Sequence, residues 1–210
     1  MISKINVYDE KYYHKKEEYN KRTLVNLLNI LKKKRKIVLY SEKIFVKSYE
    51  YIGNKFETYV QEKITEDFSN KDNILFHYEV DKKNKLIYLY SLRNDNFKDI
   101  YKDAIEFTIE PIQFKIRNKI IKKLGKNKNI LVFYRIDNVN NVIYIRKSFI
   151  AGMIISKNIE EIKSFIIEKR EDEDILVFSK ETNSFKEFED IKIDYFIDLG
   201  VNKYENLRKK

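Results

Sequence analysis

Apolar and polar positions along residues 130–200 alternate with two different periods. Residues 130–136 (ILVFYRI) and 142–148 (VIYIRKS) are rich in β-branched and aromatic residues, and the polar stretch Asp137–Asn141 separates them. This pattern predicts a β-hairpin. A strand containing Gly152, an amphipathic helix, a strand, a short helix or turn and a last strand before Gly200 follow. The order β-β-β-α-β-α-β is that of a ribonuclease-H-like core.

The first part of the chain shows a similar order of elements. Residues 4–8 form a predicted strand, and residues 17–36 form a predicted helix with its leucines on one face. Two strands follow on either side of a turn at residues 41–42. An amphipathic helix, a second hairpin, a short helix and a strand come next, and a last helix begins near Pro111 and ends at Gly125.

Both parts together predict the fold class and the division of the chain. We expect an α/β protein of two tandem ribonuclease-H-like halves with mixed sheets, which is the actin-like architecture. The first half covers residues 1–128, the second covers 129–200, and residues 201–210 form a basic C-terminal tail.

Charge and composition narrow the function classes. The chain has 43 Lys and Arg against 33 Asp and Glu, a net charge of +10. This balance suits nucleic acid, anionic lipid or an acidic partner, and a lysine-rich solvated surface explains it equally well. Without Cys, the chain has no disulfide, cysteine zinc site or cysteine nucleophile. Its two His are far apart, so a His-rich metal site is excluded; we expect His14 to be exposed and His77 to be half-buried.

Patterns that would support catalysis are also missing. A nuclease of this fold needs several carboxylates around paired metals, but the centre of strand 130–136 is apolar, Asp198 stands alone, and residues 172–174 fit a solvated turn. An actin-like ATPase needs glycine where the backbone approaches phosphates, and the turns at 137–141 and 41–42 contain none. We expect no catalytic, cofactor-binding or metal-binding residues, and a protein that is not an enzyme.

Nucleic-acid binding is the alternative from another class. Aromatic and basic residues interleave in the hairpin, and an exposed face of this kind stacks bases and neutralises phosphates. Such a chain would be a basic phage- or plasmid-type protein that binds nucleic acid or a nucleoprotein complex, for example an inhibitor of a host defence system. Strand alternation over a core explains the same letters. The candidate residues are Tyr134, Arg135, Tyr144, Arg146 and Lys147.

Several stretches resemble one known family. The chain is similar, over about residues 36–170, to the cytoplasmic actin-like domains of the type IV pilus protein PilM and the type II secretion protein GspL. The resemblance rests on a strand and helix with an E-x-I-like turn, a hairpin, a "v-x-P" step before a helix, and a Gly-containing strand after the second hairpin. These features are at residues 43–68 with Glu62–Ile64, 74–92, Ile109–Pro111 and Ile150–Met153.

The resemblance implies a non-catalytic cytoplasmic scaffold or adaptor. Members of this family link an assembly ATPase to an inner-membrane platform, and pilus members bind ATP and a short peptide of a membrane partner. The glycine-free hairpin turns put nucleotide binding in doubt and favour the secretion-type, scaffold function. The expected partners are therefore proteins: the assembly ATPase and the platform proteins, at the inner face of the cytoplasmic membrane.

The C-terminus offers a separate indication. A basic cluster at Arg208, Lys209 and Lys210 is typical of the cytoplasmic flank of a membrane helix. Continuation into a membrane anchor beyond residue 210 is one interpretation, and an ordinary basic tail is the other.

Overall fold

Strands from the first half of the chain form a five-stranded mixed sheet. The computed structural model describes residues 2–53, 55–69, 71–181 and 185–201. The sheet has the order β3-β2-β1-β4-β8, antiparallel between its first three strands and parallel from β1 to β8. Its strands are β1 (Ser3–Tyr8), β2 (Lys11–His14), β3 (Glu17–Asn20), β4 (Lys34–Leu39) and β8 (Glu106–Pro111).

The second half repeats this arrangement. Its sheet has the order β11-β10-β9-β12-β13, again antiparallel in the opening three strands and parallel thereafter. The same strand order in both sheets confirms the predicted pair of ribonuclease-H-like halves. The strands are β9 (Asn129–Ile136), β10 (Val139–Arg146), β11 (Phe149–Ser156), β12 (Ile175–Ser179) and β13 (Tyr195–Ile197).

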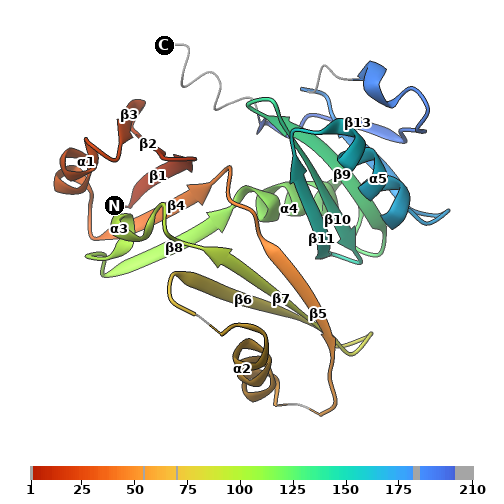
Figure 1. Ribbon diagram of the computed structural model, residues 1–210, viewed down its shortest axis with the longest axis horizontal. Coiled ribbons are helices and arrows are strands. Elements are labelled where there is room, and N and C mark those ends of the chain that lie inside the picture. Colours follow the sequence, from red (N-terminus) through yellow and green to blue (C-terminus); the bar gives the residue numbers. More distant parts are fainter. Residues whose placement is uncertain (1, 54, 70, 182–184, 202–210) are drawn as a thin grey trace.

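A third, antiparallel sheet is inserted between β4 and β8. It has the order β5-β7-β6, and one of its faces packs against α2, where Val60 and Ile64 meet Ile87 and Leu89. Figure 1 shows it extending away from the two larger sheets. The bounds are β5 (Phe45–Glu50), α2 (Phe56–Asp67), β6 (Ile74–Asp81) and β7 (Leu86–Arg93).

Helix α4 lies between the two five-stranded sheets (Figure 1). Its residues Ile112, Ile116 and Ile120 belong to one buried apolar cluster that also contains Ile37 of β4 and Val132 of β9. A single core therefore joins both halves. The helices are α1 (Leu24–Ile30), α3 (Lys98–Tyr101), α4 (Ile112–Leu124), α5 (Ile159–Lys169) and the 3₁₀ helix η1 (Phe185–Phe188).

The helix predicted at residues 17–36 is wrong at both ends. Glu17–Asn20 is a strand because the residues before it, Lys15 and Lys16, adopt positive φ angles of 49° and 75° and turn the chain back on β2. Residues 34–36 are also a strand, parallel to β1. Only Leu24–Ile30 is helical. Local helix propensity is overridden here by sheet pairing.

Two further predictions in this half are wrong. Residues 41–42 are not a hairpin turn, because β4 and β5 belong to different sheets. His14 is buried rather than exposed, since it lies in β2 and its Nδ1 is 2.9 Å from the carbonyl oxygen of Lys4 in β1.

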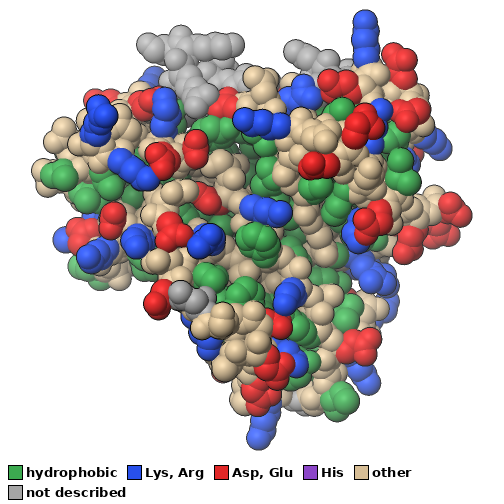
Figure 2. Space-filling model, in the orientation of Figure 1, with side chains coloured by type: hydrophobic (Ala, Val, Ile, Leu, Met, Phe, Trp, Pro, Cys, Tyr) green, Lys and Arg blue, Asp and Glu red, His purple; other side chains and the backbone are tan. Residues whose placement is uncertain are grey.

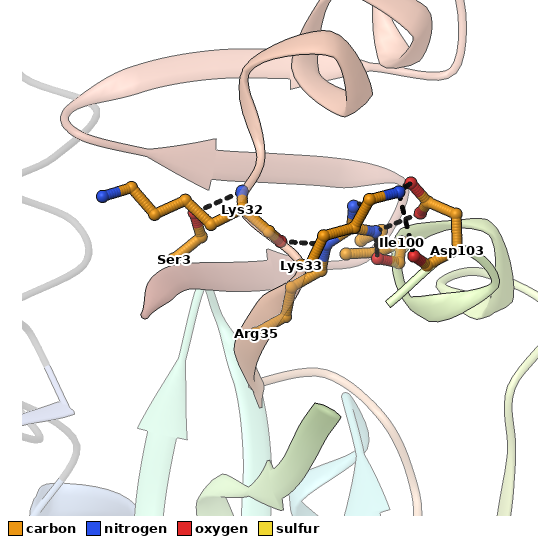
Figure 3. Close-up of polar contacts among 6 residues, drawn as sticks. All are labelled: Ser3, Lys32, Lys33, Arg35, Ile100 and Asp103. Carbon is orange, nitrogen blue, oxygen red and sulfur yellow. Dashed lines mark hydrogen bonds and ion pairs between the residues drawn. The ribbon is translucent and has the colours of Figure 1, made fainter. Parts of the chain in front are cut away.

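Arg35 ties α3 to the first sheet (Figure 3). Its side chain is fully buried although it carries a charge. The guanidinium donates to the carboxylate of Asp103 at 2.6 and 3.1 Å, to the carbonyl oxygen of Lys32 at 2.9 Å, and to that of Ile100. A buried charge is tolerated only with such partners.

Charge on the surface is mixed. On the face shown in Figure 2, basic and acidic side chains are interspersed over the whole outline. Across the described residues, none of the helices combines the length and the hydrophobicity that a membrane crossing requires.

We expect Arg35→Met to lower the free energy of unfolding by about 2–4 kcal/mol, because it leaves the carbonyl oxygens of Lys32 and Ile100 without their donor. Urea denaturation measures the change. The neighbouring Lys34→Met is the control: Lys34 pairs with Glu106 at 2.5 Å on the exposed surface, and its loss costs at most about 1 kcal/mol. An equal decrease in the free energy of unfolding of both variants would show that Arg35 contributes no more to stability than an exposed ion pair.

Acid should weaken the Arg35 contact. The hydrogen bonds from Arg35 lower the pKa of Asp103 to about 2, from an ordinary value of about 3.9. A depressed pKa stabilises the fold above the ordinary value, and this stabilisation is lost as the pH falls through about 2. The urea midpoint of the wild type should therefore exceed that of Asp103→Asn at neutral pH and approach it in acid. A constant difference over this range would contradict the prediction.

Candidate functional site

A cavity of about 420 Å³ lies between the two halves at their hairpin turns. Asp9 from the β1–β2 turn, Asp137 from the β9–β10 turn and Lys157 after β11 all line it. The first-half turn that corresponds to the β9–β10 turn is therefore at residues 9–10, not at 41–42. Both turns present carboxylates to this cavity.

The β9–β10 turn is shorter than predicted. Only Asp137 and Asn138 connect the strands, with φ angles of 47° and 62°, and β10 begins at Val139. Positive φ at both turn residues is the two-residue type I′ geometry, which Asp and Asn tolerate without glycine. The amides that follow serve the fold: Asn140 Oδ1 accepts from Arg135 at 2.7 Å, and Asn141 donates to the carbonyl oxygen of Val139 at 2.9 Å.

The five residues proposed for nucleic-acid binding do not form one exposed surface. Tyr134 has no exposed surface, and burial raises the pKa of its hydroxyl. Tyr144 is 9% exposed, and burial together with the nearby carboxylates of Asp174 and Glu171 raises its pKa to about 12. Neither ring is therefore free to stack on a base.

The remaining basic candidates are scattered. Arg135 is partly buried and pairs with Glu187 at 3.2 Å, while Arg146 and Lys147 are exposed at the far end of β10. The basic residues Arg208, Lys209 and Lys210 lie outside the described residues.

A second cavity, of about 360 Å³, opens where the inserted sheet meets β8 and α4. We call this cavity the sheet–helix groove. One wall comes from β6 and β7 and the other from β8 and the first turns of α4. Its lining is mostly apolar and consists of Ile44, Leu75, Phe76, His77, Glu79, Tyr90, Leu92, Ile109, Glu110, Pro111, Phe114 and Arg117.

Aromatic rings form a cluster in the groove. The His77 ring stacks on Tyr90 with centroids 5.8 Å apart, and Phe114 meets both rings edge-on at 5.8 and 5.1 Å. The guanidinium of Arg117 lies 4.8 Å above the Phe114 ring. These contacts join α4 to the inserted sheet and give the groove a rigid apolar wall.

Beneath the rings is a compact polar network. Arg117 pairs with Glu79 at 2.5 Å, and the Tyr90 hydroxyl donates to the same carboxylate at 2.9 Å. Burial, and then the Glu79 charge, raise the pKa of Tyr90 above its ordinary value, so the hydroxyl stays a donor. The groove therefore combines apolar walls with one fixed ion pair, as ligand-binding clefts do.

Strand edges border the groove on both sides. Within the described residues, β6 pairs only with β7, and β8 pairs only with β4. An edge strand has unpaired backbone N–H and C=O groups that accept a further strand. An extended segment could therefore pair its backbone with the edge of β6 or of β8. Its side chains would then fit into the groove between these two strands.

The sequence alone does not reveal this groove. The predicted half-burial of His77 is wrong: its side chain is exposed, and Tyr90 is its cross-strand partner. One local signal was available in β6: the polar residues His77 and Glu79 alternate with apolar residues. This alternation indicates that one face of the strand is polar. Nothing local connects that face with Phe114 and Arg117.

Comparison with known proteins by sequence yields no match. No protein-family model matches the chain, and no curated protein does.

Solved structures do resemble it. A Bacteroides thetaiotaomicron protein with an actin-like ATPase fold and unknown function aligns over 99% of this chain and 94% of its own, with a TM-score of 0.60 and 11% identity. The chain has an actin-like fold. The cytoplasmic domain of EpsL, an inner membrane component of the type II secretion system of Vibrio cholerae, aligns over 100% and 95%, with a TM-score of 0.52 and 7% identity.

A third structure is more distant. The PilM–PilN type IV pilus biogenesis complex aligns over 81% of this chain and 62% of its own, with a TM-score of 0.46 and 7% identity. The family resemblance drawn from the sequence is thus confirmed at the level of the fold, by the actin-like and EpsL structures.

Two buried tyrosines should respond oppositely to loss of the hydroxyl. No described residue forms a hydrogen bond with the Tyr134 hydroxyl, so Tyr134→Phe should raise the free energy of unfolding by about 1 kcal/mol. The Tyr12 hydroxyl donates to the carbonyl oxygen of Asn96 at 2.7 Å. Tyr12→Phe should therefore lower the free energy of unfolding by about 1 kcal/mol. Urea unfolding of both variants tests this; a loss of stability in Tyr134→Phe would show that its hydroxyl is bonded.

Proposed function

We propose that the chain is a non-catalytic scaffold that binds an extended segment of a partner protein in the sheet–helix groove. The observation that carries this proposal is the position of an apolar groove between two unpaired strand edges, β6 and β8. An extended segment gains affinity by pairing its backbone with a strand edge, and specificity from pockets that accept alternate side chains.

The groove chemistry indicates what such a segment contains. Rings of His77, Tyr90 and Phe114 favour an apolar or aromatic side chain. Each wall also contains one carboxylate that already has an ion-pair partner. Glu79 pairs with Arg117 on one wall, and Glu110 pairs with Lys36 at 2.9 Å on the other. A partner segment that alternates apolar and polar residues fits both walls.

The cavity between the two halves supports the non-catalytic part of the proposal. Its turn residues Asp9 and Asp137 are not glycine, so their side chains stand where a backbone would have to approach the phosphates of a nucleotide. EpsL, whose cytoplasmic domain resembles this chain in structure, is an inner membrane component of a secretion system. This similarity supports a role for the chain in a pilus or secretion assembly. In that setting the partners would be an assembly ATPase and inner-membrane platform proteins.

Peptide selection tests the groove. Peptides selected from a random display library on the immobilised protein should bind His77→Ala and Phe114→Ala about tenfold more weakly, because each change removes ring contact from one wall. Lys83→Ala, in the exposed β6–β7 turn of the same hairpin, is the control and should bind as the wild type does. Fluorescence anisotropy gives the dissociation constants.

Two results would contradict the proposal. Selected peptides that bind both groove variants as tightly as the wild type would exclude the groove as the binding site. Hydrolysis of MgATP well above background, abolished by Asp137→Asn, would show that the protein is an enzyme.

A further inference from the structure

Two lysines stand directly opposite each other in the first sheet. Lys4 of β1 and Lys36 of β4 are paired in register, and Thr108 of β8 is the next residue in the same row. Residues in register on neighbouring strands project from the same face, with Cβ atoms about 5 Å apart. Like charges in this position repel each other and destabilise the sheet.

A third lysine joins this pair from helix α4. Lys115 lies in the first turns of α4 and is partly buried. Burial lowers the pKa of its ammonium group; Glu110 opposes this effect, and the charges of Lys4 and Lys36 add to it. Helix α4 begins directly after β8, so Lys115 follows within five residues of Glu110, the carboxylate that pairs with Lys36.

The charges of this cluster are not balanced. Glu110 pairs with Lys36 at 2.9 Å, and the nearby Lys34 is already paired with Glu106. In the described part of the chain, neither Lys4 nor Lys115 has an ion pair within 4.0 Å. Three lysines and one carboxylate leave a formal charge of +2.

Neighbouring features extend the positive field. The turn formed by Lys15 and Lys16 follows His14, whose ring contacts the backbone of Lys4. Glu17 follows this turn and is the cross-strand partner of His14, so its carboxylate offsets one of the two lysine charges. Two lysines and one carboxylate leave this turn with a formal charge of +1.

We propose that Lys4, Lys36 and Lys115 bind a phosphate group, carried by a small anion or by a lipid headgroup. A phosphate monoester has a charge of about −1.5 to −2 at neutral pH, which matches the cluster. Lysine binds phosphate as a compact point charge, and the exposed Thr108 hydroxyl supplies a further donor at the edge of the row. Binding would relieve the repulsion that the free protein tolerates.

This site adjoins the sheet–helix groove but does not depend on the groove's occupant. Glu110 is the residue that both share. His77→Ala should leave phosphate binding unchanged, and Lys115→Gln should leave the aromatic wall intact, so the two proposals fail separately.

Calorimetric titration with sodium phosphate and with pyrophosphate, at constant ionic strength set with sodium chloride, tests the site. We expect Lys4→Gln and Lys115→Gln each to weaken binding about tenfold or more, because each removes one charge-assisted hydrogen bond. Lys83→Gln removes the same charge from the exposed β6–β7 turn and should bind as the wild type does. Without ligand, Lys4→Gln should unfold at an equal or higher temperature, which shows that a lost affinity is not lost folding.

A vesicle arm identifies the source of the phosphate. Phosphatidylcholine vesicles with and without phosphatidic acid are sedimented with each variant. Binding of free phosphate that both Lys4→Gln and Lys115→Gln weaken, without a difference between the two kinds of vesicle, supports a small-anion site. Sedimentation with phosphatidic acid that the same two variants weaken supports a lipid headgroup. No binding of either probe, or equal losses in Lys115→Gln and Lys83→Gln, would overturn the proposal.

Discussion

Burial of helix α4 between the two five-stranded sheets is the constraint on which the rest of the structure depends. Ile112, Ile116 and Ile120 lie in a buried apolar cluster that contains residues of both sheets. Each such side chain stabilises the fold by roughly 1.5–3 kcal/mol when it leaves water. Because α4 follows β8 directly at Pro111, the edge strand of the first sheet also fixes where the second sheet packs. The actin-like arrangement of the halves follows from this helix.

The inserted sheet packs against β11 of the second half. One face of it is covered by α2, and from the other face Tyr88 stacks on Phe149 of β11 with centroids 5.0 Å apart. The sheet is thereby held against the second half, and no strand among the described residues pairs with the outer edge of β6. That geometry produces the sheet–helix groove beside the edge of β8. In the first five-stranded sheet, the buried charge of Arg35 is balanced by Asp103 and two backbone carbonyl oxygens and holds α3 in place. In the same strand, Lys36 projects from the opposite face, where three lysines share the single carboxylate of Glu110. Polar groups that cost stability without evident compensation are found most often at functional sites.

Much of this architecture could be predicted from the sequence. The hairpins β6–β7 and β9–β10, helix α5 and the final strands follow from apolar periodicity alone, because each is a local pattern with clear turn residues. The N-terminal hairpins could not be predicted in this way. Apart from Tyr19, residues 17–20 are polar, and they precede a leucine-rich helix, so only pairing with β2 makes them a strand. The same holds for the lysine-rich start of β4, where pairing with β1 and the partners of Arg35 decide the structure.

By itself, the sequence determined the fold class, the duplication and the absence of glycine at the hairpin turns, since these depend on composition and on near neighbours. The tertiary structure alone decided where binding surfaces form. The groove brings together His77, Phe114 and Ile109 from three different elements, and the pairing of β1 with β4 sets Lys4 beside Lys36. The tertiary structure also places Tyr134 in the core rather than on the surface, because β9 is central in its sheet and covered on both faces. Contacts between residues 30 to 110 positions apart depend on how sheets stack around α4, and no local pattern encodes that packing.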